Sequence, residues 1–261
     1  MGSDRLLLRE TPLAGVLRLR LNRPDARNAL SAALMTALDA ALAAAADDSA
    51  VHVIILAGAG PAFCAGHDLR EVMADPSEPA MRALFGQCSA LMTRIVHLRQ
   101  PVIAEVHGVA TAAGCQLVAS CDLAVAAESA RFATPGVNIG LFCSTPMVAL
   151  SRAVGRKAAM EMLLTGEMID AARAREIGLV NRVVPAAELA AATLALASTI
   201  ASKSPLTLAI GKAAFQRQVE LGLDEAYADA SEVMTRNMQT ADAGEGIAAF
   251  LAKRPPRWRG G

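Results

Sequence analysis

The chain has 261 residues, which is enough for one large domain or for a core with a smaller appended region. Lysine and arginine together number 25, and so do aspartate and glutamate, so the formal net charge is zero. A neutral chain has no overall field to attract nucleic acid or an anionic membrane, and neither partner is expected. With 54 % hydrophobic and 19 % charged residues, the composition also excludes intrinsic disorder. The apolar content favours a buried subunit interface, although the many alanines explain it as well.

Targeting and redox features favour a cytoplasmic protein. No window reaches 18 uninterrupted apolar residues, so no membrane span is predicted. Residues 1–10 mix acids and bases around a short leucine run, which is unlike a signal or transit peptide. The five cysteines contain no CxxC pair, and the four histidines show no metal-ligand spacing. The sequence therefore predicts a cytoplasmic location, reduced thiols and no metal site.

Strand-like and helix-like segments alternate through the first two thirds of the chain. The later strand candidates are nearly all apolar, as expected where helices cover both faces of a sheet. This order predicts an α/β core. The predicted segments in chain order are strand 6–9, strand 16–21, turn 22–25, helix 31–46 capped by Ser31, strand 51–57, helix 80–98, strand 101–106, helix 115–120 and strand 123–126.

From about residue 144 the strand signals nearly vanish and helical segments follow one another. No Gly/Ser-rich linker separates them from the core, so the helical tail is expected to pack on something. We divide the chain into an α/β core over 1–200 and a C-terminal helical oligomerisation region over 201–261. The predicted helices are 145–154, 156–165, 171–177, 187–202, 205–220, 223–237 and 241–252, with an extended piece at 180–184.

Two loops of small residues each follow a buried strand, over 60–69 and 107–115. Glycine and alanine let backbone N–H groups approach a ligand closely, and the second loop ends at a predicted helix N-terminus. Two such loops can aim two N–H donors at one developing oxyanion, which chemistry on an activated carbonyl requires. Tight turns without a ligand have the same composition, so spacing alone leaves both interpretations open.

A series of motifs in order resembles the crotonase superfamily, and the resemblance covers nearly the whole chain. It is most similar to the branch of enoyl-CoA hydratase domain-containing proteins, some of them mitochondrial. The resemblance implies a crotonase-like spiral of ββα units with a C-terminal helical region, assembled as a homotrimer or a dimer of trimers. The motifs are Asn22-Arg23-Pro24 with Asn28-Ala29-Leu30, 62–69, 106–115, Cys121-Asp122-Leu123, 132–135, 165–167, 178–180 and 245–254.

The resemblance also implies a bound acyl-CoA whose thioester enolate is stabilised by the backbone N–H groups of His67 and Ala113. Coenzyme A then belongs to the substrate, and no permanently bound cofactor is expected. Alternatives remain for four positions. Arg27 is alternatively a solvated charge, and Phe250 a core residue. Asp68 is alternatively a helix cap or a structural support of the oxyanion site, and His67 a side chain that points to solvent while its backbone binds. The residues assigned to CoA binding are Arg23, Arg27, Ala65, Asp68 and Leu69, together with Phe250 and Lys253, which in the family reach a CoA in an adjacent subunit.

The chain departs from the hydratases of the family at both catalytic glutamates. Gln116 and Gly136 stand at those positions, and neither can exchange a proton near neutral pH. One positioned acid or base contributes roughly 10²- to 10⁴-fold to a rate, so ordinary hydration is expected to be weak or absent. Cys143 and Ser144 are the candidates for polar side chains on the reactive side. A small buried hydrophobe is the alternative for Cys143.

These features predict an acyl-CoA thioester-processing protein, nominally a lyase or isomerase of fatty acid metabolism. A non-catalytic acyl-CoA-binding pseudoenzyme is one alternative. An acyl-CoA decarboxylase is another, because Gly66-His67-Asp68 also resembles the methylmalonyl-CoA decarboxylase branch, and decarboxylation generates its own carbanion. A structural role such as RNA binding is disfavoured, since zero net charge and 3 % aromatic residues offer neither a basic stripe nor stacking platforms.

Overall fold

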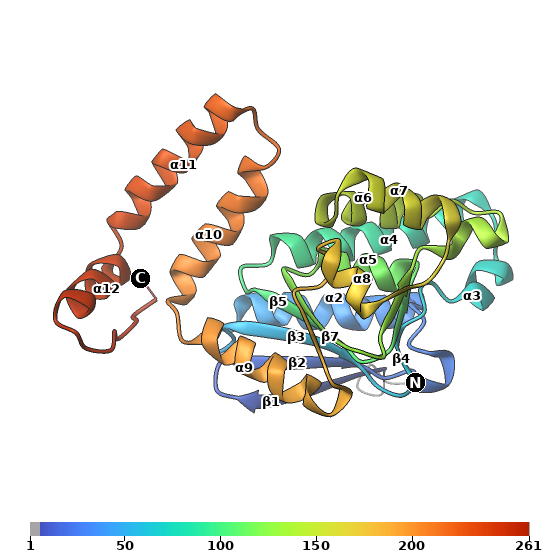
Figure 1. Ribbon diagram of the computed structural model, residues 1–261, viewed down its shortest axis with the longest axis horizontal. Helices are drawn as coiled ribbons and strands as arrows, with labels where there is room; N and C mark the ends of the chain where they lie inside the picture. Colours follow the sequence, from blue (N-terminus) through green and yellow to red (C-terminus); the bar gives the residue numbers. More distant parts are fainter. Residues whose placement is uncertain (1–5, 261) are drawn as a thin grey trace.

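The computed structural model describes residues 6–260 (Figure 1). Residues 1–5 and 261 lie outside the described part. They include half of residues 1–10, the segment that the sequence analysis found unlike a signal or transit peptide. Two β-sheets, helices against them and a series of C-terminal helices make up the fold. The predicted α/β class is confirmed.

The larger sheet has six strands in the order β1-β2-β3-β5-β7-β10. β1 and β2 form an antiparallel hairpin, and the other neighbours pair in parallel. Every residue of β3 and β5 is buried, which explains their nearly all-apolar sequences. The strands are β1 (Leu7–Leu13), β2 (Val16–Leu21), β3 (Val53–Gly58), β5 (Val102–Val106), β7 (Leu123–Ala127) and β10 (Arg182–Val184).

Helices cover both faces of this sheet. Helices α2 (Ala32–Asp47), α4 (Glu78–His97) and α5 (Ala113–Ser120) supply much of the larger core cluster on one face. Helix α9 (Leu189–Ala201) packs on the opposite face, against β3, β5 and β7 (Figure 1). The side chain of Ser31 accepts a hydrogen bond from the Leu34 N–H, which makes it the N-cap of α2 as predicted.

A second, four-stranded sheet runs through the segments that the sequence presents as irregular loops. Its order is β4-β6-β8-β9, from β4 (Ala62–Cys64), β6 (Val109–Thr111), β8 (Arg131–Ala133) and β9 (Ile169–Asp170). Treating 60–69 and 107–115 as loops throughout was therefore wrong. Strands of two or three residues are too short to show an alternation of apolar and polar residues. Because β4 pairs with β6, the segments 60–69 and 107–115 lie side by side.

The remaining helices begin and end within about two residues of their predicted positions, except the helix Leu69–Ala74, for which no bounds were predicted. β1 runs several residues beyond the predicted strand. Short 3₁₀ turns also occur at Pro24–Ala26, Pro135–Ile139 and Ala186–Glu188. The helices of the body are α3 (Leu69–Ala74), α6 (Ser144–Ala153), α7 (Arg156–Thr165) and α8 (Ala171–Glu176).

The last three helices extend away from the body as an arm (Figure 1). The arm consists of α10 (Pro205–Gln218), α11 (Leu223–Met238) and α12 (Ala241–Leu251), and neither α10 nor α11 buries a residue completely. Lys212 anchors α10 to the body, because its Nζ donates to Asp122 Oδ2 at 2.6 Å and to two backbone carbonyl oxygens at 3.0 Å. The boundary near residue 200 stays a prediction.

Among the described helices, none is by itself long and apolar enough to cross a membrane. The segments Ala186–Ala201 and Pro205–Gln218 meet the length and composition requirement only together, with a bend of 100° between them.

Candidate functional site

The two loops of small residues meet in the structure. β4 pairs with β6, and the Thr111 hydroxyl donates to the Ala65 carbonyl oxygen at 3.1 Å. Glycine permits the closest approach: a Cβ on Gly114 would lie 2.0 Å from the Cys64 carbonyl oxygen. Gly66, at a φ of +96°, abuts Ala112 and the N–H of Ala113. The loops therefore form one surface of tightly packed backbone.

The peptide unit before His67 has a fixed orientation. Its carbonyl, that of Gly66, accepts a 2.7 Å hydrogen bond from the Leu30 N–H. A trans peptide is planar, so its N–H points opposite to its carbonyl. The His67 N–H consequently points away from Leu30, and it donates to no acceptor in the part of the chain that the structure describes.

The peptide unit before Ala113 is fixed in the same way. The Ala112 carbonyl accepts the N–H of Gln116 at 3.0 Å along helix α5, so the Ala113 N–H points out of the helix N-terminus. Ala113 is the first residue of α5 and has no partner within the helix. Ala112 adopts φ 50° and ψ −118°, a costly conformation for a residue with a side chain. The Ala113 N–H has no acceptor among residues 6–260, so the backbone strain at Ala112 coincides with a donor unpaired in that range.

The His67 side chain lies between its loop and helix α4. Its ring contacts Phe85 edge-on, with centroids 5.6 Å apart and an interplanar angle of 80°. Both ring nitrogens are shielded from solvent and lack a hydrogen-bond partner of good geometry among residues 6–260. Burial lowers the pKa of the imidazole, and the backbone of Leu30 offsets part of that effect. His67 is therefore neutral at pH 7.

This burial predicts a pH-dependent stability. As pH falls through the ordinary histidine pKa of 6.5, the unfolded chain binds a proton that folded His67 binds less readily. The free energy of unfolding is expected to fall by at most about 1.4 kcal/mol per pH unit in that range from this residue. Urea unfolding of the wild type and His67→Gln between pH 7.5 and 5 tests this. An equally steep fall in both proteins would contradict it.

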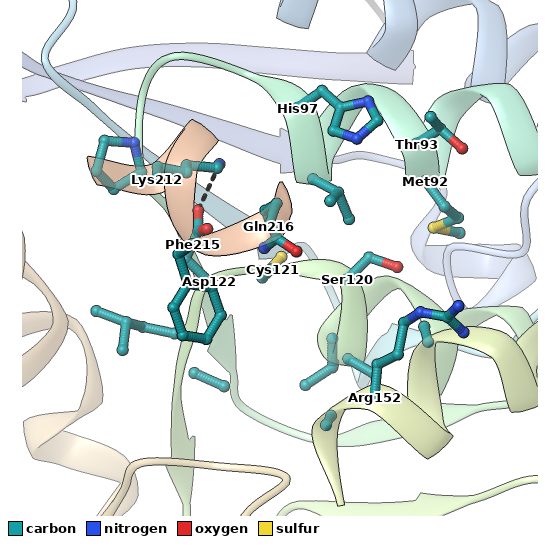
Figure 2. Close-up of a pocket in the computed structure, with 18 of the residues that line it drawn as sticks. Met92, Thr93, His97, Ser120, Cys121, Asp122, Arg152, Lys212, Phe215 and Gln216 are labelled. Atoms are coloured by element: carbon teal, nitrogen blue, oxygen red, sulfur yellow. Dashed lines mark hydrogen bonds and ion pairs between the residues drawn. The ribbon is translucent and has the colours of Figure 1, made fainter. Parts of the chain in front are cut away.

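Gln116 directly follows the second loop, one helical turn after Ala112, and is almost completely buried, at 4 % exposure. Its Oε1 lies 3.9 Å from the Cys88 sulfur on α4, one turn beyond Phe85. Gln116 also lines a cavity of about 1040 Å³ between α10 and the helices α4, α5 and α6, where Figure 2 shows the Lys212–Asp122 ion pair. The amide thus lies between the oxyanion loops and this cavity.

Gly136 is buried in the 3₁₀ turn at Pro135–Ile139. A Cβ there would lie 2.5 Å from the Leu141 carbonyl oxygen and 2.9 Å from the Cys143 sulfur. Cys143 is 7 % exposed, and burial raises the pKa of its thiol. The structure brings Cys143 to Gly136 but leaves Ser144 exposed, with its hydroxyl donating to the nearby Phe142 carbonyl oxygen at 3.3 Å.

The residues assigned to CoA binding have different environments. Arg23 is engaged by the protein, since its guanidinium donates to Asp68 Oδ2 at 2.8 Å. Asp68 caps helix α3, as its alternative interpretation proposed, by accepting the Arg70 N–H. The exposed Arg27 makes no side-chain hydrogen bond or ion pair among the described residues, and Leu69, the first residue of α3, is exposed as well. The backbone of Ala65 donates to the Arg27 carbonyl oxygen at 3.0 Å.

The two tail residues lie on the arm, away from the body. Phe250 is 82 % exposed on α12, which excludes the core alternative within this chain. Lys253 follows α12 at a φ of 53° and is also exposed. Their proposed contact with a neighbouring subunit's CoA stays a prediction.

Sequence reasoning missed several residues of the site. Phe85 packs on His67, and Thr134 carries a fully buried hydroxyl without a partner among the described residues. Lys212 pairs with a residue 90 positions away. Nothing in the local sequence indicates these contacts. Within residues 6–260, no group of three histidine, cysteine or acidic side chains could hold a metal ion.

The described geometry can be compared with known proteins. The family model for enoyl-CoA hydratase/isomerase matches residues 12–261. The chain belongs to the enoyl-CoA hydratase/isomerase family. A crystal structure of an enoyl-CoA hydratase from Mycobacterium smegmatis superimposes on this family member with a TM-score of 0.95 and 54 % identity, covering 97 % of this chain and 98 % of that one. A crystal structure of human enoyl Coenzyme A hydratase domain-containing protein 3 superimposes with a TM-score of 0.94 and 47 % identity. That comparison covers 97 % of this chain and 100 % of the human one.

A relative from Xenopus laevis is 48 % identical over 257 residues, covering 96 % of this chain and 87 % of the relative. It is named enoyl-CoA hydratase domain-containing protein 3, mitochondrial. The cytoplasmic prediction is wrong in this light, because several relatives at this level of identity are named as mitochondrial. That prediction rested on the mixed charges of residues 1–10 and on the unpaired cysteines, and neither feature establishes the compartment.

Proposed function

We propose that this family member processes acyl-CoA thioesters by holding the enolate oxygen between the N–H groups of His67 and Ala113. The observation that carries the proposal is that neither N–H group has an acceptor among the described residues, and that each is oriented by a hydrogen bond to the carbonyl of its own peptide unit. Donors that are already oriented stabilise a developing negative charge without the cost of reorganisation. The N-terminus of α5 adds the positive end of a helix dipole.

The side chains at the predicted catalytic positions are neutral, and the carboxylate nearest in sequence to the donors, that of Asp68, is held by Arg23 and by the Arg70 N–H. His67 is uncharged, Gln116 is an amide, and burial keeps the Cys143 thiol protonated. Glu71, the nearest acid along the chain after Asp68, accepts the Ala32 N–H at the start of α2. Ordinary hydration therefore has no free carboxylate to activate water, and the proposed reaction is another step through a thioester enolate, nominally of the lyase or isomerase class.

Decarboxylation is the second candidate, favoured by this absence of a carboxylate base among the described residues of the site. Loss of CO₂ from a β-carboxyacyl-CoA leaves its electron pair in the enolate, so the oxyanion donors alone can lower the barrier. Release of CO₂ from malonyl-CoA or methylmalonyl-CoA would select this candidate.

The binding test uses 2,4-hexadienoyl-CoA, whose conjugated thioester absorbs at longer wavelength when its carbonyl is polarised. The wild type should bind it with a red shift. His67→Pro and Ala113→Pro each remove one donor and should each reduce the shift. Thermal melting checks that both variants fold, because proline suits the first turn of a helix but restricts the residue before it, and Ala112 has a positive φ. Absence of binding, or binding with no shift in the wild type, would refute the proposal.

A mass-spectrometric screen of enoyl-, dienoyl-, malonyl- and β-hydroxyacyl-CoA thioesters then identifies the reaction. A shift in absorbance without conversion of any substrate would favour the non-catalytic acyl-CoA-binding alternative.

We also propose that the arm associates with other copies of the chain, as a homotrimer or a dimer of trimers. Large apolar side chains are exposed along all three of its helices, which a monomer rarely leaves in water. Light scattering on the purified protein measures the assembly, and a monomer would refute this proposal. The exposed side chains are Phe215, Val219, Leu223, Tyr227, Met234, Met238, Ile247, Phe250 and Leu251.

A further inference from the structure

We propose that Arg23 is a positioning residue for the first oxyanion donor, rather than a ligand of the CoA nucleotide. This inference rests on the proposed function, because it concerns the same N–H group of His67. Arg23 lies 44 residues before His67, and the observations that connect the two are the hydrogen bonds around Asp68 and Leu30.

Both terminal nitrogens of Arg23 are used within the protein. Nη2 donates to Asp68 Oδ2 at 2.8 Å, and Nη1 donates to the Ala29 carbonyl oxygen at 2.5 Å. The two side chains of the ion pair are only 21 % and 12 % exposed. The backbone N–H of Arg23 is itself held by Asn28 Oδ1 at 2.8 Å. The guanidinium therefore ties the segment 28–30 to the residue that follows His67.

That same segment holds the peptide units on both sides of His67. The Leu30 N–H donates to the Gly66 carbonyl oxygen at 2.7 Å, and the Leu30 carbonyl oxygen accepts the Asp68 N–H at 3.2 Å. These two bonds set the direction of the His67 N–H. Arg23 fixes the side chain of Asp68 against the carbonyl next to Leu30, so the three contacts form one clamp around His67.

The ion pair also has an electrostatic consequence. The hydrogen bond from Arg23 lowers the pKa of the Asp68 carboxyl, which is therefore ionised at neutral pH. Without the guanidinium, this negative charge would stand uncompensated one residue from the donor of the oxyanion site. It would oppose the negative charge that develops on the enolate. Removing Arg23 should thus weaken the oxyanion site both by misalignment and by repulsion.

The repulsion between Asp68 and the enolate predicts a result that loss of structure alone would not produce. Arg23→Gln should reduce the red shift of bound 2,4-hexadienoyl-CoA, and reduce turnover of any substrate by about 10- to 100-fold. Asp68→Asn introduced into Arg23→Gln should recover part of both losses, because it removes the uncompensated charge. Arg23→Lys, which keeps the positive charge, should lie between the wild type and Arg23→Gln. The affinity for free coenzyme A should change less than about two-fold, since the nucleotide is not a partner of Arg23.

The matched control is Arg94→Gln, which removes a two-point ion pair between α4 and Asp39 on α2. It should leave the red shift unchanged. Thermal melting of every variant is recorded alongside, and Arg23→Lys and Asp68→Asn keep the test available if Arg23→Gln does not fold.

Three outcomes overturn the inference. Weakening of free coenzyme A binding by ten-fold or more in Arg23→Gln, with the red shift retained, would make Arg23 a nucleotide ligand. An unchanged red shift together with unchanged coenzyme A binding would make the ion pair structural only. A wild type that binds the dienoyl-CoA without a red shift would refute the oxyanion site itself, and that result is distinguishable because it needs no variant.

Discussion

Crotonyl-CoA hydration by the purified protein is expected to fall about 10²-fold or more below that of an enzyme with both glutamates, and in any case below about 1 s⁻¹. Gln116 is buried with its carboxamide against Cys88, and an amide neither takes nor gives a proton near neutral pH. Gly136 contributes no side chain. The loss of the enoyl-thioester absorbance measures the rate. Turnover in the ordinary hydratase range would contradict this expectation.

The two positions differ in what restoring a glutamate would do. Gln116→Glu replaces an amide by a group of nearly the same size, so the fold should tolerate it and hydration should rise. Gly136→Glu places a Cβ 2.5 Å from the backbone oxygen of Leu141, which cannot move aside without shifting its chain segment. The double variant is therefore expected to be less stable and no faster than Gln116→Glu. A double variant faster by ten-fold or more would show that segment 141–143 adapts.

The sequence could predict the helices and the central strands because each has a local signature. Apolar residues at helical spacing, the Ser31 cap and the all-apolar strands β3 and β5 need no knowledge of distant residues. The second sheet could not be predicted. Its strands have two or three residues, and they exist because β4, β6 and β8 satisfy one another's backbone groups.

In the candidate site, too, the sequence indicates some features and only the fold reveals the others. Small residues after buried strands indicate the two loops, and the family motifs indicate which N–H groups are concerned. The orientation of those groups depends on Leu30 for His67 and on helix α5 for Ala113, so only the fold reveals it. The pairing of Arg23 with Asp68 spans 45 residues, and the family resemblance suggested a different partner, the CoA nucleotide.

The second large effect is expected at Gly114. Gly114→Ala should prevent folding or lower the free energy of unfolding by more than about 4 kcal/mol, which is exceptional for a single substitution. A methyl group there would lie 2.0 Å from the Cys64 carbonyl oxygen and 2.7 Å from its carbonyl carbon. Both are backbone atoms of strand β4, so relief requires the two oxyanion loops to separate.

Gly86→Ala is the matched control for this substitution. Gly86 lies inside α4 with nothing within 4 Å of an added Cβ, and alanine should stabilise that helix by about 0.5–1 kcal/mol. The same chemical change thus has opposite expected signs at the two sites. Urea unfolding of both variants measures them, together with binding of 2,4-hexadienoyl-CoA by any Gly114→Ala protein that remains folded. A folded Gly114→Ala protein with wild-type stability and an unchanged red shift would contradict the close contact of the loops. In the proposed function a donor from each loop reaches one oxygen atom, which requires this contact, so stability and carbonyl polarisation should be lost together.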